Sequence, residues 1–211
     1  MLPGKVGVAI ASAGAEPVSL GEWSVGVAWS TIKVPLAVAA LRAGVARSDQ
    51  LIAAITRSDN AAAEDLWSHL GDPAAALVQS VLREAGDPVS VVESGRLRSE
   101  YTPFGQTRWS LADQARFAAG LSLVPGSSPV IDLMGALTVD HQWGLAAKGL
   151  AAKGGWGPGL SDEYLVRQFA IVSGTVGVAL AAEVRDGGYQ AGVEAMNSLA
   201  DWVVDEALTE Y

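Results

Sequence analysis

The sequence predicts an α+β fold in which one antiparallel sheet is built from both ends of the chain. Segments with the two-residue hydrophobic period of strands lie near the start and near the end, at about residues 5–23 and 151–185. The intervening residues show helical, alanine-rich patterns. The economical arrangement is a sheet flanked by the first and last helices, with a reduced helical lobe between them.

The N-terminal region predicts a hairpin followed by a long helix. Between residues 5 and 11, Val6, Val8 and Ile10 alternate with small residues, as in a strand with one buried face. After Gly14, residues 17–23 return as the second arm. Residues 30–45 then become helical, and Pro35 is tolerated because it lies in the opening turns.

The middle of the chain predicts short helices and one long loop. Helices are expected at about 50–56, 60–70 and 73–85. Residues 86–109 are irregular, and a loop of that length in a compact domain is usually functional. Ser110 and Asp113 form a capping-box pattern that opens a helix to about Leu121, and another short helix is expected around 128–137.

The C-terminal region predicts three strands and a closing helix. The strands are expected at 151–156, 164–173 and 176–185, with a turn at Gly174 between the last two. Apolar residues recur at helical spacing over about 190–208. We expect a single domain over 1–211, with a sheet lobe at about 1–45 and 140–211 and a helical lobe at about 46–139.

Composition excludes several classes of function. The net charge of −9 disfavours binding to nucleic acid, and the chain has no Cys for disulfides or thiolate sites. Its two histidines, His69 and His141, are too far apart in sequence for a His-rich metal site and are interpreted as structural. We therefore expect no metal and no cofactor.

Targeting signals are also missing from the printed sequence. No apolar stretch is long enough to span a membrane, and Met1-Leu2-Pro3 does not begin a recognisable signal peptide. Composition does not separate a cytoplasmic protein from an exported one whose leader has been removed.

Three short motifs stand out against chance. With only two Asn in the chain, a Ser-Asp-Asn string is expected about 0.01 times. A Ser-x-x-Lys string is expected about 0.3 times and a Lys-Gly-Gly string about 0.05 times. The chain contains all three, in this order: Ser30-Thr31-Ile32-Lys33, Ser58-Asp59-Asn60 and Lys153-Gly154-Gly155.

The residue types in these motifs suit nucleophilic catalysis. Ser30 is expected to open a helix, where free N–H groups favour a developing anion. Lys33 lies one turn further on, within reach of the Ser30 hydroxyl, and a desolvated Lys there would have a lowered pKa and accept its proton. Lys153 on an edge strand would supply a second cation, and Gly154 and Gly155 would let a substrate backbone approach.

The motif set resembles that of the penicillin-recognising serine hydrolases, the family of class A β-lactamases and D-Ala-D-Ala peptidases. The resemblance covers nearly the whole chain and implies a β-lactamase/transpeptidase-like fold. It implies that Ser30 is the acylated nucleophile and Lys33 its base or proton relay. Ser58 would pass a proton to the leaving nitrogen, Asn60 would bind the substrate amide, and Lys153 would bind a substrate carboxylate.

The resemblance also implies an oxyanion hole and a class of substrate. The hole would be formed by the backbone N–H groups of Ser30 and Trp156, the residue that follows Gly155. Substrates would be small β-lactams or peptidoglycan peptides ending in D-Ala, and export to the cell envelope is the family expectation. The oligomeric state is left open.

Three departures from the family pattern predict slow turnover. Gly154 stands where a Thr or Ser is usual, and only 28 residues separate Ser30 from Ser58. No Glu-x-x-Leu-Asn loop for a deacylating water is found, because neither Glu93 nor Glu100 has an Asn four residues later. An acyl-enzyme is therefore expected to persist, with Glu93, Glu100 and Lys33 left open as groups that activate water.

Two other functional readings remain open. A non-catalytic relative would keep the fold and bind a peptide or cell-wall fragment. An esterase would use the same acyl-transfer residues on another leaving group. Structural roles also stand beside the catalytic ones, since Ser30 and Ser58-Asp59-Asn60 are common types of helix cap.

Overall fold

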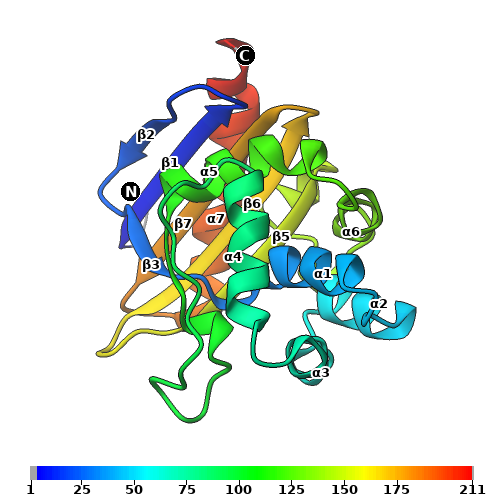
Figure 1. Ribbon diagram of the computed structural model, residues 1–211. Helices are drawn as coiled ribbons and strands as arrows, with labels where there is room; N and C mark the ends of the chain where they lie inside the picture. The colour runs from blue at the N-terminus through cyan, green and yellow to red at the C-terminus, as the bar shows by residue number, and fades with distance from the viewer. Residues whose placement is uncertain (1–3, 211) are drawn as a thin grey trace.

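The computed structural model describes residues 4–210, and the Met1-Leu2-Pro3 segment considered for a signal peptide lies outside that range. Its centre is a five-stranded antiparallel sheet with the strand order β2-β1-β7-β6-β5 (Figure 1). The strands are β1 (Lys5–Ser12), β2 (Val18–Gly21), β5 (Ala151–Pro158), β6 (Tyr164–Ser173) and β7 (Val176–Val184). The predicted α+β class, with a sheet built from both ends of the chain, is confirmed.

The two ends of the sequence meet in the middle of this sheet. β1 pairs along its full length with β7, from Lys5 opposite Glu183 to Ser12 opposite Val176. β7 is buried almost throughout and reads as a nearly continuous apolar run, as expected for a strand covered on both faces. This pairing leaves β5, which carries Lys153, at one edge of the sheet.

Helices cover both faces of the sheet (Figure 1). On one face α7 (Gly188–Asp205) packs on β6 and β7, with Met196, Leu199 and Val203 in its buried stripe. On the other face α5 (Leu111–Gly120) packs on β1 and β7. A side chain at Gly177 would lie 2.4 Å from the Ala115 oxygen, so the small residue permits this close packing.

The remaining α-helices pack together beside the sheet, around one buried helix. They are α1 (Lys33–Arg42), α2 (Ser48–Thr56), α3 (Asn60–Leu70), α4 (Ala74–Glu84) and α6 (Ser128–Met134). α1 contacts α2, α3 and α4 and is buried along most of its length. As expected, Ser110 caps α5 by accepting a hydrogen bond from the Asp113 N–H, and Asp59 caps α3 in the same way through Ala62.

Two features differ from the sequence prediction. A two-stranded sheet of β3 (Val25–Val27) and β4 (Arg108–Ser110) was missed, because strands of three residues carry little periodic signal. The helix expected over 30–45 begins at Lys33 and ends at Arg42, preceded by the 3₁₀ turn η1 (Trp29–Ile32). Within residues 4–210, no helix is both long and apolar enough to cross a membrane.

Candidate active site

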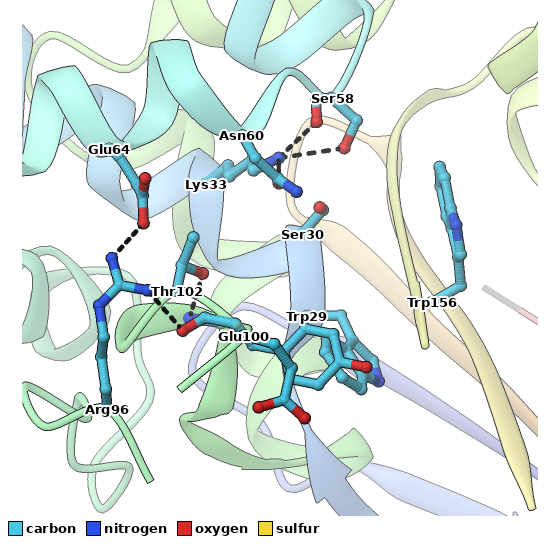
Figure 2. A pocket seen from close by; sticks show the side chains of 12 residues that line it. Trp29, Ser30, Lys33, Ser58, Asn60, Glu64, Arg96, Glu100, Thr102 and Trp156 are labelled. Carbon is cyan, nitrogen blue, oxygen red and sulfur yellow. Dashed lines mark hydrogen bonds and ion pairs between the residues drawn. The ribbon is translucent and has the colours of Figure 1, made fainter. Parts of the chain in front are cut away.

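The three motifs converge at one pocket of about 320 Å³. η1 and α1 bring Ser30 and Lys33, the start of α3 brings Ser58 and Asn60, and β5 brings Trp156 (Figure 2). The 86–109 loop closes another side with residues from 96 to 105. Lys153 and Gly155 lie directly behind this lining, in contact with Ser58 and with the Ser30 turn.

Ser30 lies in a strained turn. Outside glycine, Trp29 and Ser58 are the two residues in the described range with positive φ, at 50° and 56°. Such a backbone conformation costs on the order of 1–3 kcal/mol and concentrates at functional sites. The sequence prediction that Ser30 opens an α-helix is therefore wrong. Ser30 follows the strained Trp29 within the 3₁₀ turn that precedes α1.

A network of buried, hydrogen-bonded polar side chains supports this turn. Thr31 donates a hydrogen bond to the Ala28 oxygen and accepts one from Gln114. Arg167, fully buried on β6, donates to Gln114 and to the backbone oxygens of Val27 and Trp109. Burial lowers the pKa of Arg167 to about 9. The Ser30 turn is thus tied to the central sheet and to the β3–β4 pair.

Lys33 is buried and its amine contacts the second motif. Its Nζ donates to the Ser58 backbone oxygen and to Asn60 Oδ1 at 2.7 Å, and lies 3.5 Å from Ser58 Oγ. Burial lowers the pKa of Lys33 to about 7, although the Asp59 carboxylate opposes the shift. A neutral amine has two N–H groups and one lone pair, and two carbonyl oxygens here accept its two hydrogens.

The expected hydrogen bond between Ser30 and Lys33 is not formed. Among the described residues the Lys33 amine has Ser58 and Asn60 as its partners, and both motifs face the same pocket. Carbonyl oxygens satisfy its N–H donors, so the amine turns toward α3 (Figure 2). Ser30 and Lys33 both line the pocket, but no hydrogen bond joins the Ser30 hydroxyl to the Lys33 amine (Figure 2).

Ser58 lies between the two lysines. Its hydroxyl accepts a hydrogen bond of 2.8 Å from Lys153 Nζ, which also donates to the Gly154 oxygen at 3.0 Å. Lys153 is 2% exposed, and burial together with the nearby Lys33 holds its pKa well below the usual range. The Lys33 pKa is lowered by burial, as predicted. The repulsion that was also expected to lower it acts instead on the pKa of Lys153.

Gly155 explains how β5 reaches the Ser30 turn. A Cβ atom at this position would lie 2.8 Å from the Ser30 nitrogen and 3.0 Å from the Thr31 nitrogen. Glycine therefore brings the strand backbone against the turn, and Trp156 is the next residue along it. This approach suits an oxyanion hole shared by the Ser30 and Trp156 N–H groups.

Gly154 faces the other side of β5, where an indole ring fills the space. A Cβ atom at this position would lie 2.6 Å from Cζ2 of Trp143. The Thr or Ser of the family pattern would therefore collide with Trp143. The departure at the third motif has a direct steric cause.

An aromatic cluster backs Trp156 at the rim of the pocket. The His141 ring stacks on Trp156 at a centroid distance of 5.3 Å, and Tyr189 from α7 packs on it at 5.1 Å. Burial and Lys153 lower the pKa of His141, which favours the neutral imidazole. His141, interpreted from sequence as structural, therefore helps to hold a wall of the pocket.

The pocket also contains residues that the motif analysis missed. Glu64, one turn after Asn60 on α3, forms an ion pair of 2.5 Å with Arg96 of the loop. Arg96 also donates to the Tyr101 oxygen, and the buried Gln106 side chain holds the loop backbone at Arg98. The four-residue spacing from Asn60 is a signal that would have found Glu64, because it places both on one helix face.

The two loop carboxylates considered from sequence do not reach Ser30. Glu93 is outside the pocket lining and accepts a hydrogen bond from the Gly95 N–H. Glu100 borders the pocket, but its carboxylate turns away from Ser30 and accepts from Ser99 (Figure 2). A backbone hydrogen bond at Glu100 lowers the pKa of its carboxyl, and the Ser99 contact and Arg98 act in the same direction.

Comparison with known proteins gives matches in structure alone. No protein-family model matches the sequence, and no curated protein matches it. Solved structures do match: a variant of the class A β-lactamase of the last common ancestor of Gram-negative bacteria is 20% identical, with a TM-score of 0.70 over 99% of this chain and 94% of that one.

Two natural proteins give the same result. A class A β-lactamase from Mycobacterium abscessus is 16% identical, with a TM-score of 0.68 over 99% of this chain and 95% of that one. A β-lactamase from Xanthomonas campestris is 18% identical, with a TM-score of 0.70 over 97% and 92% of the two chains. The likeness expected from the three motifs is confirmed at the level of fold: the chain has the fold of the class A β-lactamases.

Proposed function

We propose that this protein is a serine acyl-enzyme hydrolase of the β-lactamase and penicillin-binding type. Its substrates would be β-lactams or peptidyl-D-Ala-like amides, small molecules or peptidoglycan peptides, and it would release the acyl group slowly. The observation that carries the proposal is the pocket in which Ser30 lies beside a buried Lys33 whose pKa is lowered to about 7. That lysine has the properties of a general base at neutral pH.

Acylation would proceed by attack of Ser30 Oγ on the substrate carbonyl. The Oγ–C bond forms, the C–N bond of the amide or lactam breaks, and the Ser30 proton passes to the lone pair of Lys33. Ser58, which contacts both lysines, would carry a proton to the leaving nitrogen. The N–H groups of Ser30 and Trp156 would bind the developing oxyanion, and Asn60 would bind the substrate amide.

Deacylation would be the weak step. Hydrolysis of the ester needs a water held against its carbonyl by a base. Glu64 is paired with Arg96, and the Glu100 side chain is 59% exposed and turns away from Ser30 (Figure 2). In the part of the chain that the structure describes, no carboxylate has a hydrogen bond to Ser30, Lys33 or Asn60, so Lys33 is the remaining candidate base.

The test is covalent labelling with a fluorescent penicillin over a long incubation. We expect a labelled band that is absent in Ser30→Ala and forms more slowly in Lys33→Ala, by about 10²–10⁴-fold, as is typical for the loss of a general base. His69→Ala, a change on the exposed side of α3, is the control and should label normally. Labelling that survives Ser30→Ala would contradict the proposal. No labelling by any acyl donor would favour the non-catalytic binding alternative.

A further inference from the structure

In the part of the chain that the structure describes, each cationic side chain in the pocket lining already has a partner: Lys33 donates to Ser58 and Asn60, and Arg96 pairs with Glu64. Just outside the lining, Arg98 lies 3.8 Å from Glu100 and donates to the Pro158 oxygen. Both guanidinium groups near the opening therefore already have carboxylate partners.

Lys153 is also poorly placed for this role. Its amine is buried behind the lining, where it donates to Ser58 Oγ and to the Gly154 oxygen. No hydroxyl stands beside it at position 154, because the Trp143 ring occupies that space. The burial that lowers the pKa of both lysines also reduces the positive charge that would attract an anion.

The remaining surface of the pocket is largely aromatic. Trp156 forms one wall, supported by His141 and Tyr189. Trp29 and Tyr101 form another, with their rings edge to face at 5.0 Å. Aromatic walls of this kind bind flat apolar groups. The carboxylates of Glu64 and Glu100 in the lining keep Arg96 and Arg98 paired, so neither guanidinium is free for a substrate carboxylate.

We propose that the pocket selects acyl donors whose leaving part is apolar and uncharged, and discriminates against donors that carry a carboxylate there. This inference rests on the proposed acylation of Ser30 and specifies its substrate class. Neutral esters and neutral lactams fit the site better than free-acid penicillins or peptides with a C-terminal carboxylate. Free acids remain substrates, but slow ones.

A matched pair of β-lactams tests this selectivity directly. Benzylpenicillin and its methyl ester share the lactam ring and the acyl side chain and differ in one charge. We expect the second-order rate constant for Ser30 acylation, followed by intact-protein mass, to be at least about fivefold higher for the methyl ester, a difference of roughly 1 kcal/mol. A ratio below about fivefold overturns the selectivity and leaves acylation at Ser30 standing. No adduct from either compound overturns both.

A charge variant tests the electrostatic cause. Glu100→Gln removes the exposed carboxylate partner of Arg98 and so leaves that guanidinium free to attract a substrate carboxylate. It should raise the rate for the free acid about two- to threefold at low salt and leave the methyl ester unchanged. Asp72→Asn makes the same change in net charge on the exposed turn between α3 and α4, outside the lining, and should alter neither rate. Equal responses to the two variants would overturn the electrostatic cause.

A ring variant tests the aromatic wall. Trp156→Leu keeps the backbone N–H and removes the stacked ring, so the methyl ester should bind about tenfold more weakly with little change in the limiting acylation rate. Trp156→Phe should restore most of the binding and controls for a general loss of structure. Unchanged binding in Trp156→Leu, or a loss that Trp156→Phe does not restore, would overturn the role of this wall.

Discussion

At the scale of single residues, Lys33 determines what the pocket does. It is 1% exposed, and this burial lowers its pKa to about 7 by disfavouring the charged form. The same burial that makes it a base also makes it a costly residue for the fold. Both consequences depend on pH and are measurable separately.

The first consequence is a pH profile for acylation. Because the pKa of Lys33 is about 7, the fraction of neutral amine rises tenfold per pH unit below that value and levels off above it. We expect the acylation rate constant to follow this curve between pH 5 and 9, measured by labelling with a neutral donor. Lys33→Arg, which stays charged, should lack the rise. A flat profile in the unmodified protein would contradict Lys33 as the base.

The second consequence is a pH-dependent stability. Lys33 has a pKa of about 7 in the folded protein and about 10.4 when unfolded, so between these values the unfolded state binds more protons. The free energy of unfolding should therefore rise with pH across this window, and the full burial cost should be present below it. Lys33→Met removes this pH-dependent cost. The gain in free energy of unfolding of the variant over the unmodified protein should therefore be larger at pH 6 than at pH 9, measured by urea unfolding. A difference between the two proteins that is independent of pH would refute this.

At the scale of elements, the close approach of β5 to the Ser30 turn shapes the site. Gly155→Ala would place a Cβ atom 2.8 Å from the Ser30 nitrogen, so the strand or the turn must shift. Since misplacement by about 1 Å costs roughly 10²-fold in rate, acylation should fall by that order. Gly135→Ala at the end of α6, where the new atom would lie 3.4 Å from the Asp132 oxygen, is the control and should acylate normally. Equal acylation rates in the two variants would show that the close approach of Gly155 to the Ser30 turn is not needed for acylation.

Arg167 links the elements that carry the turn. Its guanidinium on β6 bonds backbone oxygens of β3 and β4 and the Gln114 side chain of α5. Arg167→Met would leave several buried acceptors without donors and should destabilise the fold by about 2–4 kcal/mol. Arg42→Met, which breaks the exposed ion pair with Glu84, should cost less than about 1 kcal/mol in the same urea titration. Similar costs for the two would contradict a structural role for the buried network.

At the scale of the whole molecule, local patterns predicted most of the fold. The strands expected at 164–173 and 176–185 match β6 and β7 closely, because their apolar runs and the turn at Gly174 are local signals. β3 and β4 were missed because they exist only through pairing with each other. The division into lobes at about 46 and 140 stays a prediction, and α5 from the middle range packs on the sheet.

The sequence predicted the residues of the candidate site that belong to the three motifs, but not the residues around them. Ser30, Lys33, Ser58 and Lys153 were found from short strings, which are local. The Arg96 ion pair and the His141 stack on Trp156 join residues far apart in sequence, so no local pattern announces them. The Lys33 amine is oriented by oxygens of Ser58 and Asn60, which come from another segment of the chain. Helical spacing around Lys33 therefore could not predict these contacts.

The most direct test of acyl transfer at Ser30 is the mass of the protein after reaction with benzylpenicillin methyl ester and removal of the excess. We predict an increase by the mass of the whole lactam, because ring opening keeps both fragments on the enzyme. Peptide mapping should place it on Ser30, and it should persist while nitrocefin turnover stays low. An unchanged mass, a modification at another residue, or an adduct lost rapidly with fast turnover would contradict a slowly deacylating Ser30 enzyme.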